Sequence, residues 1–433
     1  MQIILLSGGS GKRLWPLSNE VRSKQFIKFF KKDANTYESM VQRMYASIKK
    51  AMPDATITVA TSKTQVSSLK NQLSDSINVC LEPDRRDTFP AICLAALFLK
   101  DECKVDENEA VVVIPVDPYV EQDYFETVKK IAENVDKCTS NITLMGIKPT
   151  YPSEKYGYIV PDGKGGVKEF KEKPDVEGAK KLLDLGAYWN GGVFGFKLKY
   201  MAEKAKEMLG VSDYNDLFER YSNVSKISID YALVEKEKSI ELVEYAGEWM
   251  DVGTWKTLTH VMSEKTLGKV LMDDTCEDSY VINETDLPII AMGLKNVIVA
   301  AGPDGVLVAD RDQSSYMKPL VEKVEEPIKY ADKSWGSYTV LDSTAKSMTI
   351  KVVLRAGNQM KYHMHEHRDE VWTVLSGIGE VTLDGVKRKI NVGDTVSIKR
   401  NVKHTVEAVT DLVMTEVQVG EDISAGDKKV YKL

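Results

Sequence analysis

Residues 2–26 read QIILLSGGSGKRLWPLSNEVRSKQF, and this stretch decides how the first part of the chain folds. The run 2-QIILLS-7 is short and apolar, and it ends in glycines. A short apolar run that stops at a turn is typical of a strand buried inside a parallel sheet. The sequence therefore predicts a buried strand over residues 2–7, followed directly by a glycine-rich turn.

Apolar runs alternate with amphipathic stretches in the residues that follow. This alternation predicts a doubly wound, Rossmann-like α/β sheet that helices cover on both faces and that continues to about residue 265. The predicted strands lie at 56–61, 110–117, 156–161, 191–197 and 241–245, and the predicted helices at 37–52, 65–73 and 89–102.

The pattern of apolar and turn residues changes after residue 265. Short β-like pieces between turn residues fill 266–325, and the charged stretch 322–334 carries a proline, as a linker does. The last hundred residues are strand-rich with regularly spaced glycine turns, which predicts a small β-barrel or jelly roll. We therefore expect three parts, at residues 1–265, 266–328 and 329–433.

Composition excludes several classes of protein. The 433 residues carry a formal net charge of −7, so no basic surface for nucleic acid is expected. The longest apolar runs, such as 110-AVVVIPV-116, fall far short of the ~20 residues that cross a bilayer. The N-terminal apolar run is also too short for a signal peptide. We expect a cytoplasmic protein with free thiols, because its cysteines are scattered and form no CxxC pair. They are Cys80, Cys93, Cys103, Cys138 and Cys276.

The turn after the first strand carries the first chemical signal. It lacks the third glycine of a dinucleotide fingerprint, and Lys12 is followed by Arg13 rather than by the Ser or Thr of a P-loop. Its glycines nevertheless allow backbone N–H groups to approach phosphates closely. Arg13 and Lys24 add positive charge for phosphate oxygens. The alternative is a plain glycine turn that links a strand to a helix.

Residues 8-GGSGKRLWPLSNEVRSKQF-26 closely resemble the signature of sugar-1-phosphate nucleotidyltransferases, in particular the mannose-1-phosphate guanylyltransferases. Further segments resemble that family's motifs in the family's order. They are 82-EPDRRDTFPAICLAAL-97, 110-AVVVIPVDPYV-120, 169-EFKEKPD-175, 187-AYWNGGVFGF-196, 229-IDYALVEK-236 and 249-WMDVGTW-255. The resemblance implies synthesis of a nucleotide sugar from a nucleoside triphosphate and a sugar-1-phosphate, with GTP and mannose-1-phosphate as the first expectation.

The chain departs from the family pattern at several positions near nucleotide-contacting motifs. Asp87 stands for Asn, Phe89 for Ala and Pro118 for His, while Lys12 and Ser23 are changes within the loop. CTP, UTP or dTTP, or another sugar phosphate, therefore stay open as substrates. A non-enzymatic sugar-nucleotide sensor is a further hypothesis. The presence of Arg13, Lys24, Asp117 and Asp251 argues against it.

The resemblance and the residue chemistry together imply a set of site residues. Asp117 and Asp251 are expected to hold Mg²⁺ against a triphosphate and, with Arg13 and Lys24, to form the catalytic group. The alternative for each aspartate is a capping or solvent-facing role. Nucleotide binding is expected at Gly8, Gly9, Ser10, Gly11, Lys12 and Glu82, and sugar-phosphate binding at Gly157, Glu172, Lys173 and Asn190.

The second chemical signal lies near the C-terminal end of the sequence. Of five histidines, four fall within residues 363–404, in the pattern G-x5-H-x-H-x4-E-x6-G followed by a later histidine. This pattern closely resembles the two cupin motifs. On a strand, His363 and His365 point to one face, so both could reach one metal. With Glu370 and His404 they would complete a three-histidine, one-carboxylate site for Zn, Fe, Mn or Ni. The alternative is a histidine-bearing strand with no metal.

The same region resembles the C-terminal domain of the type II phosphomannose isomerase/guanylyltransferase bifunctional enzymes. The family motif QMHHHRxEHW corresponds here to 363-HMHEHRDEVW-372. The sequence ends in 420-GEDISAGDKKVYKL-433, without the arginines of the family's ending. The expected cupin is therefore a metal-dependent mannose-6-phosphate isomerase, another sugar-modifying enzyme or a structural metal domain, and it could pair two subunits in a homodimer.

Overall fold

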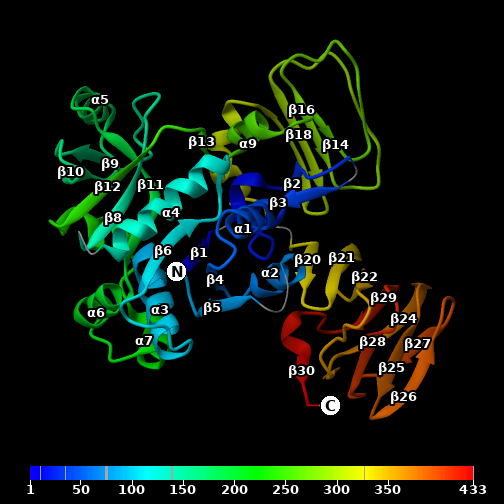
Figure 1. Ribbon diagram of the computed structural model, residues 1–433. Helices are drawn as coiled ribbons and strands as arrows, with labels where there is room; N and C mark the ends of the chain where they lie inside the picture. The colour runs from blue at the N-terminus through cyan, green and yellow to red at the C-terminus, as the bar shows by residue number, and fades with distance from the viewer. Residues whose placement is uncertain (10, 35, 74–76, 138–139, 326, 433) are drawn as a thin grey trace. The chain divides into compact units, whose positions relative to one another are not determined.

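The computed structural model describes residues 1–433 except 10, 35, 74–76, 138–139, 326 and 433 (Figure 1). The chain forms two compact units. Unit 1 contains Met1–Gly9, Gln25–Val66 and Gln72–Ser263, and unit 2 contains Ser10–Lys24, Ser67–Asn71 and Glu264–Leu433. The second unit thus includes two short segments from the first third of the sequence. The three-part division at residues 265 and 328 stays a prediction.

Unit 1 is built on one mixed sheet. The predicted strand at 2–7 is β1 (Gln2–Ser7), which pairs in parallel with β4 (Thr56–Ser62) and with β6 (Ala110–Pro115). The order across the sheet is β10-β9-β11-β6-β1-β4-β5, and β8 pairs with β11 and β12. The remaining strands are β5 (Asn78–Glu82), β8 (Ile142–Ile147), β9 (Tyr158–Pro161), β10 (Val167–Lys171), β11 (Tyr188–Lys197) and β12 (Ile240–Tyr245).

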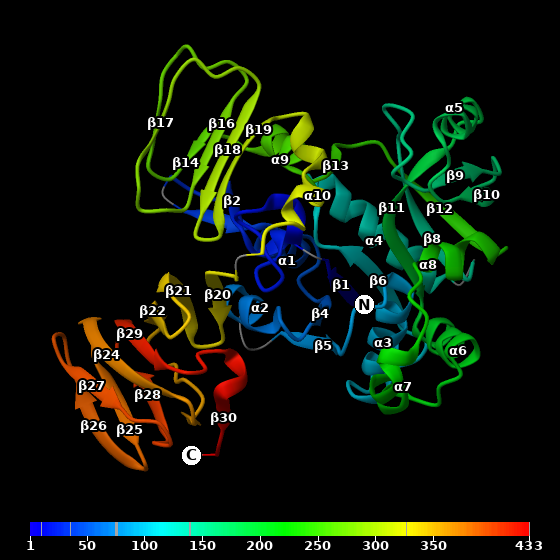
Figure 2. The same ribbon diagram turned by 180° about the vertical axis from the view of Figure 1, so that it is seen from behind.

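Helices cover both faces of this sheet, as predicted. Ile4, Val111 and Val113 alternate along their strands toward a core that they share with α3 (Thr88–Asp101) and α6 (Leu198–Leu209). Figure 2 shows α3, α6 and α7 (Tyr214–Arg220) gathered together, and α8 (Ile229–Ala232) contributes to the same core.

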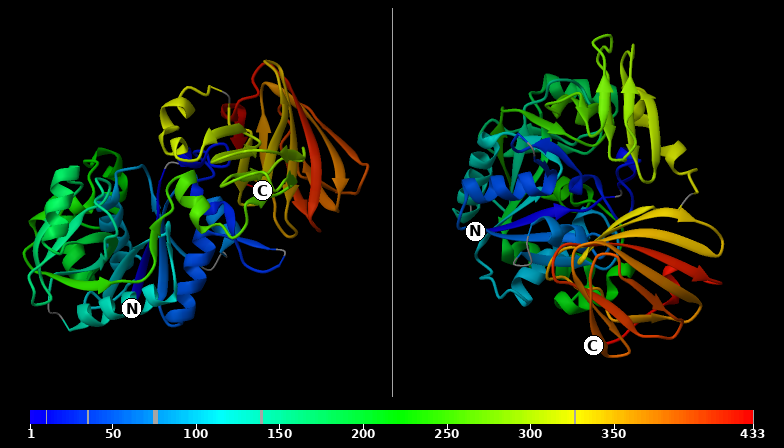
Figure 3. Two further views of the ribbon diagram at one scale, coloured as in Figure 1. Left: turned by 90° about the horizontal axis from the view of Figure 1, so that it is seen from above. Right: turned by 90° about the vertical axis from the view of Figure 1, so that its right-hand side faces the viewer.

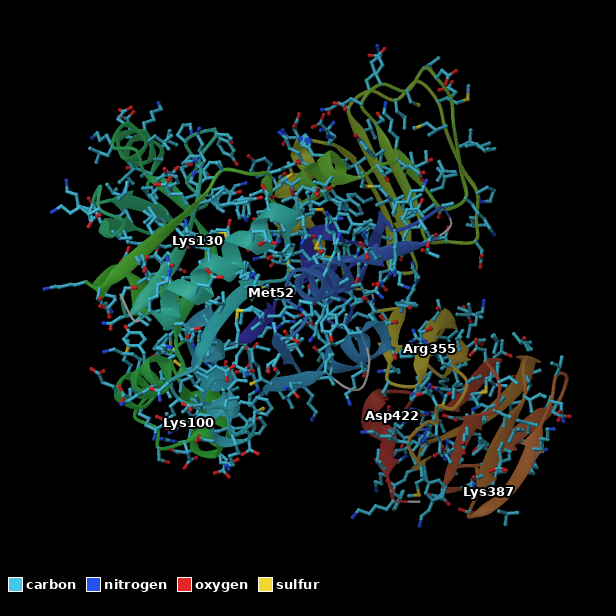
Figure 4. All side chains as sticks on the ribbon, viewed as in Figure 1. Met52, Lys100, Lys130, Arg355, Lys387 and Asp422 are labelled. Carbon is cyan, nitrogen blue, oxygen red and sulfur yellow. The ribbon has the colours of Figure 1, made fainter. Side chains whose placement is uncertain are left out.

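The opposite face of the sheet receives α4 (Gln122–Asp136). Gly195 lies between Phe194 and Phe196 of β11, and a Cβ there would meet Ile131 and Val135 of α4. The exposed side of α4 carries Lys130 (Figure 4). The remaining helices of this unit are α1 (Met40–Ala51), α5 (Val176–Asp184) and α9 (Trp255–Val261), whereas most of α2 (Val66–Gln72) belongs to unit 2.

One prediction about unit 1 needs correction, and the sheet has one feature that was not predicted. The helix expected over 37–52 begins at Met40, because Ser39 and Gln42 form a capping box. Residues Tyr37–Ser39 are instead the strand β3, paired with β2 (Lys28–Lys31). The sheet is also not wholly parallel, since β11 runs antiparallel to β6. A buried apolar run has the same composition in either direction, so its pattern could not predict this.

Short strands form the β-rich connector of unit 2, as predicted, and all of them pair in parallel except β18 and β19, which are antiparallel. One sheet has the order β14-β16-β18-β19, and a second pair joins β15 and β17. Their bounds are β14 (Thr266–Leu267), β15 (Val270–Met272), β16 (Tyr280–Asn283), β17 (Ile289–Ala291), β18 (Val297–Gly302) and β19 (Gly305–Asp310). The short helix α10 (Lys318–Val321) follows them.

Two β-sheets form the C-terminal barrel of the same unit, which confirms the predicted cupin-like fold (Figure 3). Its core contains Trp372, Val374 and Val396, while Lys387 lies on the exposed β26 (Figure 4). The larger sheet contains β20 (Tyr330–Lys333), β21 (Gly336–Ser343), β22 (Ser347–Leu354), β29 (Leu412–Gly420), β24 (Arg368–Ser376) and β27 (Thr395–Ile398). The other contains β26 (Val386–Ile390), β25 (Gly379–Leu383), β28 (His404–Ala408), β23 (His363–His365) and β30 (Lys428–Val430).

Two sequence expectations concern the chain as a whole. Cys80, Cys93, Cys103 and Cys276 are free thiols, and Cys138 lies outside the described residues. Within the described ranges, no helix is long and apolar enough to span a membrane.

Candidate functional sites

The glycine turn begins where β1 leaves the sheet. Gly8 and Gly9 have open space where a Cβ would stand, and Gly9 has a φ of +131°, which favours glycine. Leu6 lies opposite Pro115 on β6, and Val116 N donates to Leu6 O at 3.1 Å. The carboxyl ends of these two strands therefore open on the same edge of the sheet, where ligands of open α/β sheets bind.

A buried polar network holds the base of this turn. Gln25 Nε2 lies 3.3 Å from both Ser7 O and Ser7 Oγ and 3.2 Å from Gln65 Oε1. Thr61 Oγ1 donates to Ser7 O at 3.2 Å, and Gln65 Nε2 donates to Gly9 O at 3.2 Å. These bonds fix the backbone at Ser7 and Gly9, at the base of the loop.

The rest of the loop belongs to unit 2. Arg13 is exposed on a 3-10 turn (Gly11–Leu14), and Lys24 begins a second one (Lys24–Phe26). Lys12, predicted to bind nucleotide, lies 3.4 Å from Glu20 Oε1 in an ion pair. Ser10 lies outside the described residues.

Asp117 and Asp251 are brought together by a two-stranded ribbon in unit 1. Strand β7 (Pro118–Val120) follows Asp117 directly and pairs antiparallel with β13 (Trp249–Asp251). In this register Asp251 lies opposite Pro118, the residue after Asp117. The backbones of Asp117 and Asp251 therefore lie on neighbouring segments beyond the carboxyl end of β6, the edge of the sheet where ligands of open α/β sheets bind.

The residues predicted to bind the sugar phosphate also meet. A Cβ at Gly157 would stand 2.5 Å from Glu172 Oε2 and 3.3 Å from Asn190 Cβ, so a side chain there would displace the Glu172 carboxylate. Asn190 N donates to Gly157 O at 2.8 Å, and Lys173 Nζ lies 2.6 Å from Glu172 Oε1. Glu172 is buried and Lys173 half-exposed, which leaves the ammonium accessible to an anion.

Asp230 lies in the motif 229–236, and no role was predicted for it from the sequence. Its Oδ1 accepts a hydrogen bond of 2.7 Å from Asn190 Nδ2. Burial and the neighbouring Glu172 raise the pKa of Asp230 to about 6. The only signal in the sequence is a single aspartate among apolar residues of a short helix. That this aspartate lies beside Asn190 becomes clear only from the fold.

Aromatic contacts connect the strand that carries Asp251 to the cluster of residues around Gly157. Tyr156, next to Gly157, packs on Trp249 with ring centroids 5.4 Å apart and on Trp189 at 4.9 Å. Trp249 lies on the strand that ends at Asp251, and Trp189 precedes Asn190. The strand that carries Asp251 and the cluster around Gly157 are therefore parts of one region of unit 1.

Glu82 lies apart from these groups, at the carboxyl end of β5. It is 8% exposed and accepts a hydrogen bond of 3.2 Å from Tyr221 Oη. Burial raises the pKa of Glu82 to about 7, although the Tyr221 hydrogen bond and Arg85 oppose this.

The shifted pKa of Glu82 predicts a pH effect on stability. Its folded-state value lies above the unfolded value of about 4.5, so proton binding favours the folded state. The stability of the wild type should therefore decline through this group as pH rises from about 4.5 to about 7. Urea unfolding should show that Glu82→Gln removes this decline, whereas the exposed control Glu102→Gln keeps it. Equal pH profiles for Glu82→Gln and wild type would show the assignment to be wrong.

Three histidines converge inside the barrel. The potential metal-binding atoms of His363, His365 and His404 all lie within 4.8 Å of one another, and all three side chains are buried. Each Nδ1 faces a backbone carbonyl: that of Lys361 at 2.6 Å, of Asp427 at 3.2 Å and of Val402 at 2.9 Å, respectively. A proton on each Nδ1 leaves each Nε2 as a lone-pair donor, which is the tautomer of metal-binding histidines.

Glu370 contacts two of these histidines. Its carboxylate oxygens lie 3.0 Å from His365 Nε2 and 3.4 Å from His404 Nε2. His404 Nε2 is buried without a hydrogen-bond partner among the described residues. Three imidazole nitrogens and a carboxylate that converge in this way are a donor set that fits a transition metal ion.

Two further ionisable side chains, Arg368 and Glu416, are buried near this site, and the sequence pattern identified neither of them. Arg368 Nε lies 3.3 Å from Glu370 Oε1, and its Nη2 lies 3.2 Å from His365 Nε2. Burial and the neighbouring Glu370 raise the pKa of Glu416 to about 8, so near neutral pH this carboxyl holds a proton.

Two protein-family models match the chain, one over the region of the glycine turn and the aspartates and the other over the barrel. A family model described as nucleotidyl transferase matches residues 2–267, and one described as mannose-6-phosphate isomerase C-terminal matches residues 323–431.

Relatives resemble the chain over nearly its whole length. A mannose-1-phosphate guanylyltransferase of Klebsiella pneumoniae is 28% identical, over 98% of this chain and 97% of the relative. The xanthan biosynthesis protein XanB of Xanthomonas campestris is 29% identical, over 98% and 96%. A crystal structure described as mannose-1-phosphate geranyltransferase from Thermus thermophilus has a TM-score of 0.61 and 28% identity, covering 75% of this chain and 99% of its own.

Proposed function

Because this chain belongs to the nucleotidyl transferase family, we propose that it transfers a nucleotidyl group from a nucleoside triphosphate to a sugar-1-phosphate, and that these are GTP and mannose-1-phosphate. The observation that carries the proposal is the register of the β7–β13 ribbon, which sets Asp251 beside the residue after Asp117. The choice of GTP and mannose rests on the full-length relatives, several of which are named mannose-1-phosphate guanylyltransferases.

The reaction is an in-line displacement at phosphorus. A phosphate oxygen of the sugar-1-phosphate attacks the α-phosphorus, the bond from that phosphorus to the bridging oxygen breaks, and pyrophosphate leaves with the electron pair. Such chemistry needs positioning and charge neutralisation rather than a protein nucleophile. Asp117 and Asp251 are the residues that would hold Mg²⁺, which when bound neutralises charge on the triphosphate.

Arg13 and Lys24 have the charge to stabilise the reacting phosphates. The guanidinium can bind two phosphate oxygens at once, and an exposed side chain such as that of Arg13 is accessible to substrate. The backbone N–H groups of Gly8, Gly9 and Gly11 would line the phosphates, with Lys12 and Glu82 as further nucleotide contacts. Ser10 is part of the same proposed loop.

The cluster around Gly157 would select the sugar phosphate. Glu172 can accept hydrogen bonds from sugar hydroxyls, and the half-exposed Lys173 can pair with the phosphate. Asn190 is held by Asp230, so its side chain is oriented before substrate arrives. Preorganised polar groups of this kind discriminate between sugars that differ in one hydroxyl.

A substrate matrix tests the proposed function. The purified full-length chain is mixed with each of GTP, CTP, UTP, dTTP and ATP against mannose-1-phosphate, glucose-1-phosphate and mannose-6-phosphate, and pyrophosphate release is recorded. The proposal expects the highest kcat/KM for GTP with mannose-1-phosphate, and dependence on Mg²⁺. Pyrophosphate release with none of the sugar-1-phosphates would overturn it.

The barrel supports a second proposed activity. His363, His365, Glu370 and His404 would hold a transition metal ion such as Zn, Fe, Mn or Ni, and the match to a mannose-6-phosphate isomerase C-terminal family supports a sugar-phosphate isomerase. Interconversion of mannose-6-phosphate and fructose-6-phosphate by the full-length chain tests this.

The remaining proposals concern partners and location. A nucleoside triphosphate and a sugar-1-phosphate are the proposed small-molecule partners, and the net charge of −7 favours neither nucleic acid nor an anionic membrane surface. We also propose a cytoplasmic location and a homodimer paired through the barrel.

Removing one imidazole should empty the proposed metal site. In His365→Ala, bound transition metal should fall from about one ion per chain to near zero, because ligation is local to the barrel. Nucleotidyl transfer should stay near the wild-type rate. The matched control is His367→Ala, which removes an exposed imidazole two residues away. Elemental analysis of the purified proteins gives the metal content, and full metal occupancy in His365→Ala would contradict the proposed site.

A further inference from the structure

We call the glycine turn and the residues that follow it, up to Lys24, the phosphate loop. The second half of this loop is anchored to the connector and to the first strand of the barrel, and all of these segments belong to unit 2. Asn19 is 8% exposed, and its Nδ2 donates to Asp304 Oδ2 at 2.7 Å and to Tyr330 O at 3.3 Å. Its Oδ1 accepts from the backbone N of Val21 and Arg22, at 2.9 and 2.7 Å. One side chain thus fixes the turn and ties it to the connector.

Arg22 makes a second set of contacts between the loop and the connector. Its guanidinium forms a two-bond ion pair with Glu284, with Nη1 2.5 Å from Oε2 and Nη2 3.0 Å from Oε1. The same group lies over the Tyr330 ring, 5.1 Å from its centroid, and Nη1 donates to Leu17 O at 3.4 Å. A planar, doubly bonded pair with an aromatic contact fixes both position and orientation.

Two glycines of the connector allow the loop to approach closely. A Cβ at Gly305 would stand 2.6 Å from the Trp15 ring, and a Cβ at Gly302 would stand 2.8 Å from Leu17 Cδ2. Trp15 and Leu17 therefore pack against the connector backbone itself.

We propose that Arg22 and Asn19, with Glu284 and Asp304, form a clamp that positions the phosphate loop for nucleotidyl transfer. Arg22 and Asn19 are positioning residues in this proposal, since they act through Arg13 and Lys24, which lie in the same loop. The inference rests on the proposed function. A glycine-rich loop pays a large conformational entropy to hold one geometry, and misplacing a reacting group by about 1 Å can cost about 10²-fold in rate.

The connector provides a matched control for a merely structural role. Arg311, 7% exposed, pairs with Asp278 Oδ1 at 2.5 Å and lies 5.5 Å from the Tyr280 ring centroid. This is the same combination of ion pair and aromatic contact, but both partners belong to the connector rather than to the loop. Loss of Arg311 should therefore destabilise the connector without displacing Arg13.

The experiment compares Arg22→Met and Arg311→Met in the full-length chain. Each variant is measured for Tm, for kcat and KM with GTP and mannose-1-phosphate, and for hydrogen exchange over residues 12–24. We expect Arg22→Met to lose at least about ten-fold in kcat and to exchange faster in the loop. Arg311→Met should show a similar fall in Tm with kcat within about two-fold of wild type. Arg22→Lys, which keeps the charge and one bond, should restore part of kcat.

Three results would overturn the clamp. They are a folded Arg22→Met with wild-type kcat, an equal fall of kcat in Arg311→Met, and unchanged exchange over residues 12–24 in Arg22→Met. If Arg22→Met does not fold, Glu284→Gln takes its place with the same expectations, because it keeps the shape of the side chain and removes its charge. Failure of the proposed function would look different, since the wild-type chain itself would then release no pyrophosphate.

Discussion

Replacing Arg13 by alanine is expected to lower kcat for nucleotidyl transfer by about 10²-fold or more. Arg13 is exposed on the short turn Gly11–Leu14, so its truncation removes little packing. What it removes is the charge that we propose stabilises the pentavalent phosphorus and the departing pyrophosphate. KM for GTP should change less than kcat, because the interaction is strongest in the transition state. Steady-state kinetics with pyrophosphate detection measures both.

The control for Arg13→Ala is Arg388→Ala, which removes another exposed arginine, on strand β26 of the barrel. Its kcat should match that of the wild type. If folded Arg13→Ala kept near-wild-type turnover, the assignment of this loop to the phosphates would be wrong.

The second large effect is expected from the two ribbon carboxylates. Asp117→Asn and Asp251→Asn keep the shape of the side chain and remove the charge that would hold Mg²⁺ against the triphosphate. We expect kcat/KM at ordinary Mg²⁺ concentration to fall by on the order of 10²-fold in each. Raised Mg²⁺ should restore part of the activity, because a weakened site fills again by mass action.

The test is a Mg²⁺ titration of rate for wild type and both variants, with exposed Asp54→Asn as the control. Both variants should need more Mg²⁺ for half-maximal rate, and the control should not. Unchanged Mg²⁺ dependence in Asp117→Asn and Asp251→Asn would contradict the two-carboxylate site.

Short-range patterns were enough to predict much of the fold. The apolar run 2–7 and the run that begins at Ala110 become neighbouring parallel strands, since residues buried on both faces must be apolar throughout. The spacing of His363 and His365 likewise predicted their convergence, because alternate residues of a strand share a face. These signals lie within a few residues of one another, where sequence and geometry are directly linked.

Long-range arrangement could not be predicted from the same patterns. Nothing near Asn190 indicates that its amide meets Asp230, forty residues later. Nothing near Arg22 indicates Glu284 as its partner, since the two residues are 262 positions apart in the sequence. The loop was therefore predicted as a local phosphate turn, and its anchoring to the connector follows from tertiary packing alone.

The most direct test of the proposed nucleotidyl transfer follows the α-phosphate of GTP into the nucleotide sugar. The full-length chain is incubated with mannose-1-phosphate, Mg²⁺ and GTP labelled in its α-phosphate, and the products are separated and examined by phosphorus NMR. The account predicts that the label appears in GDP-mannose, with one pyrophosphate released for each molecule formed. Release of GDP and inorganic phosphate, or label that stays in GTP while mannose-1-phosphate is unchanged, would contradict it.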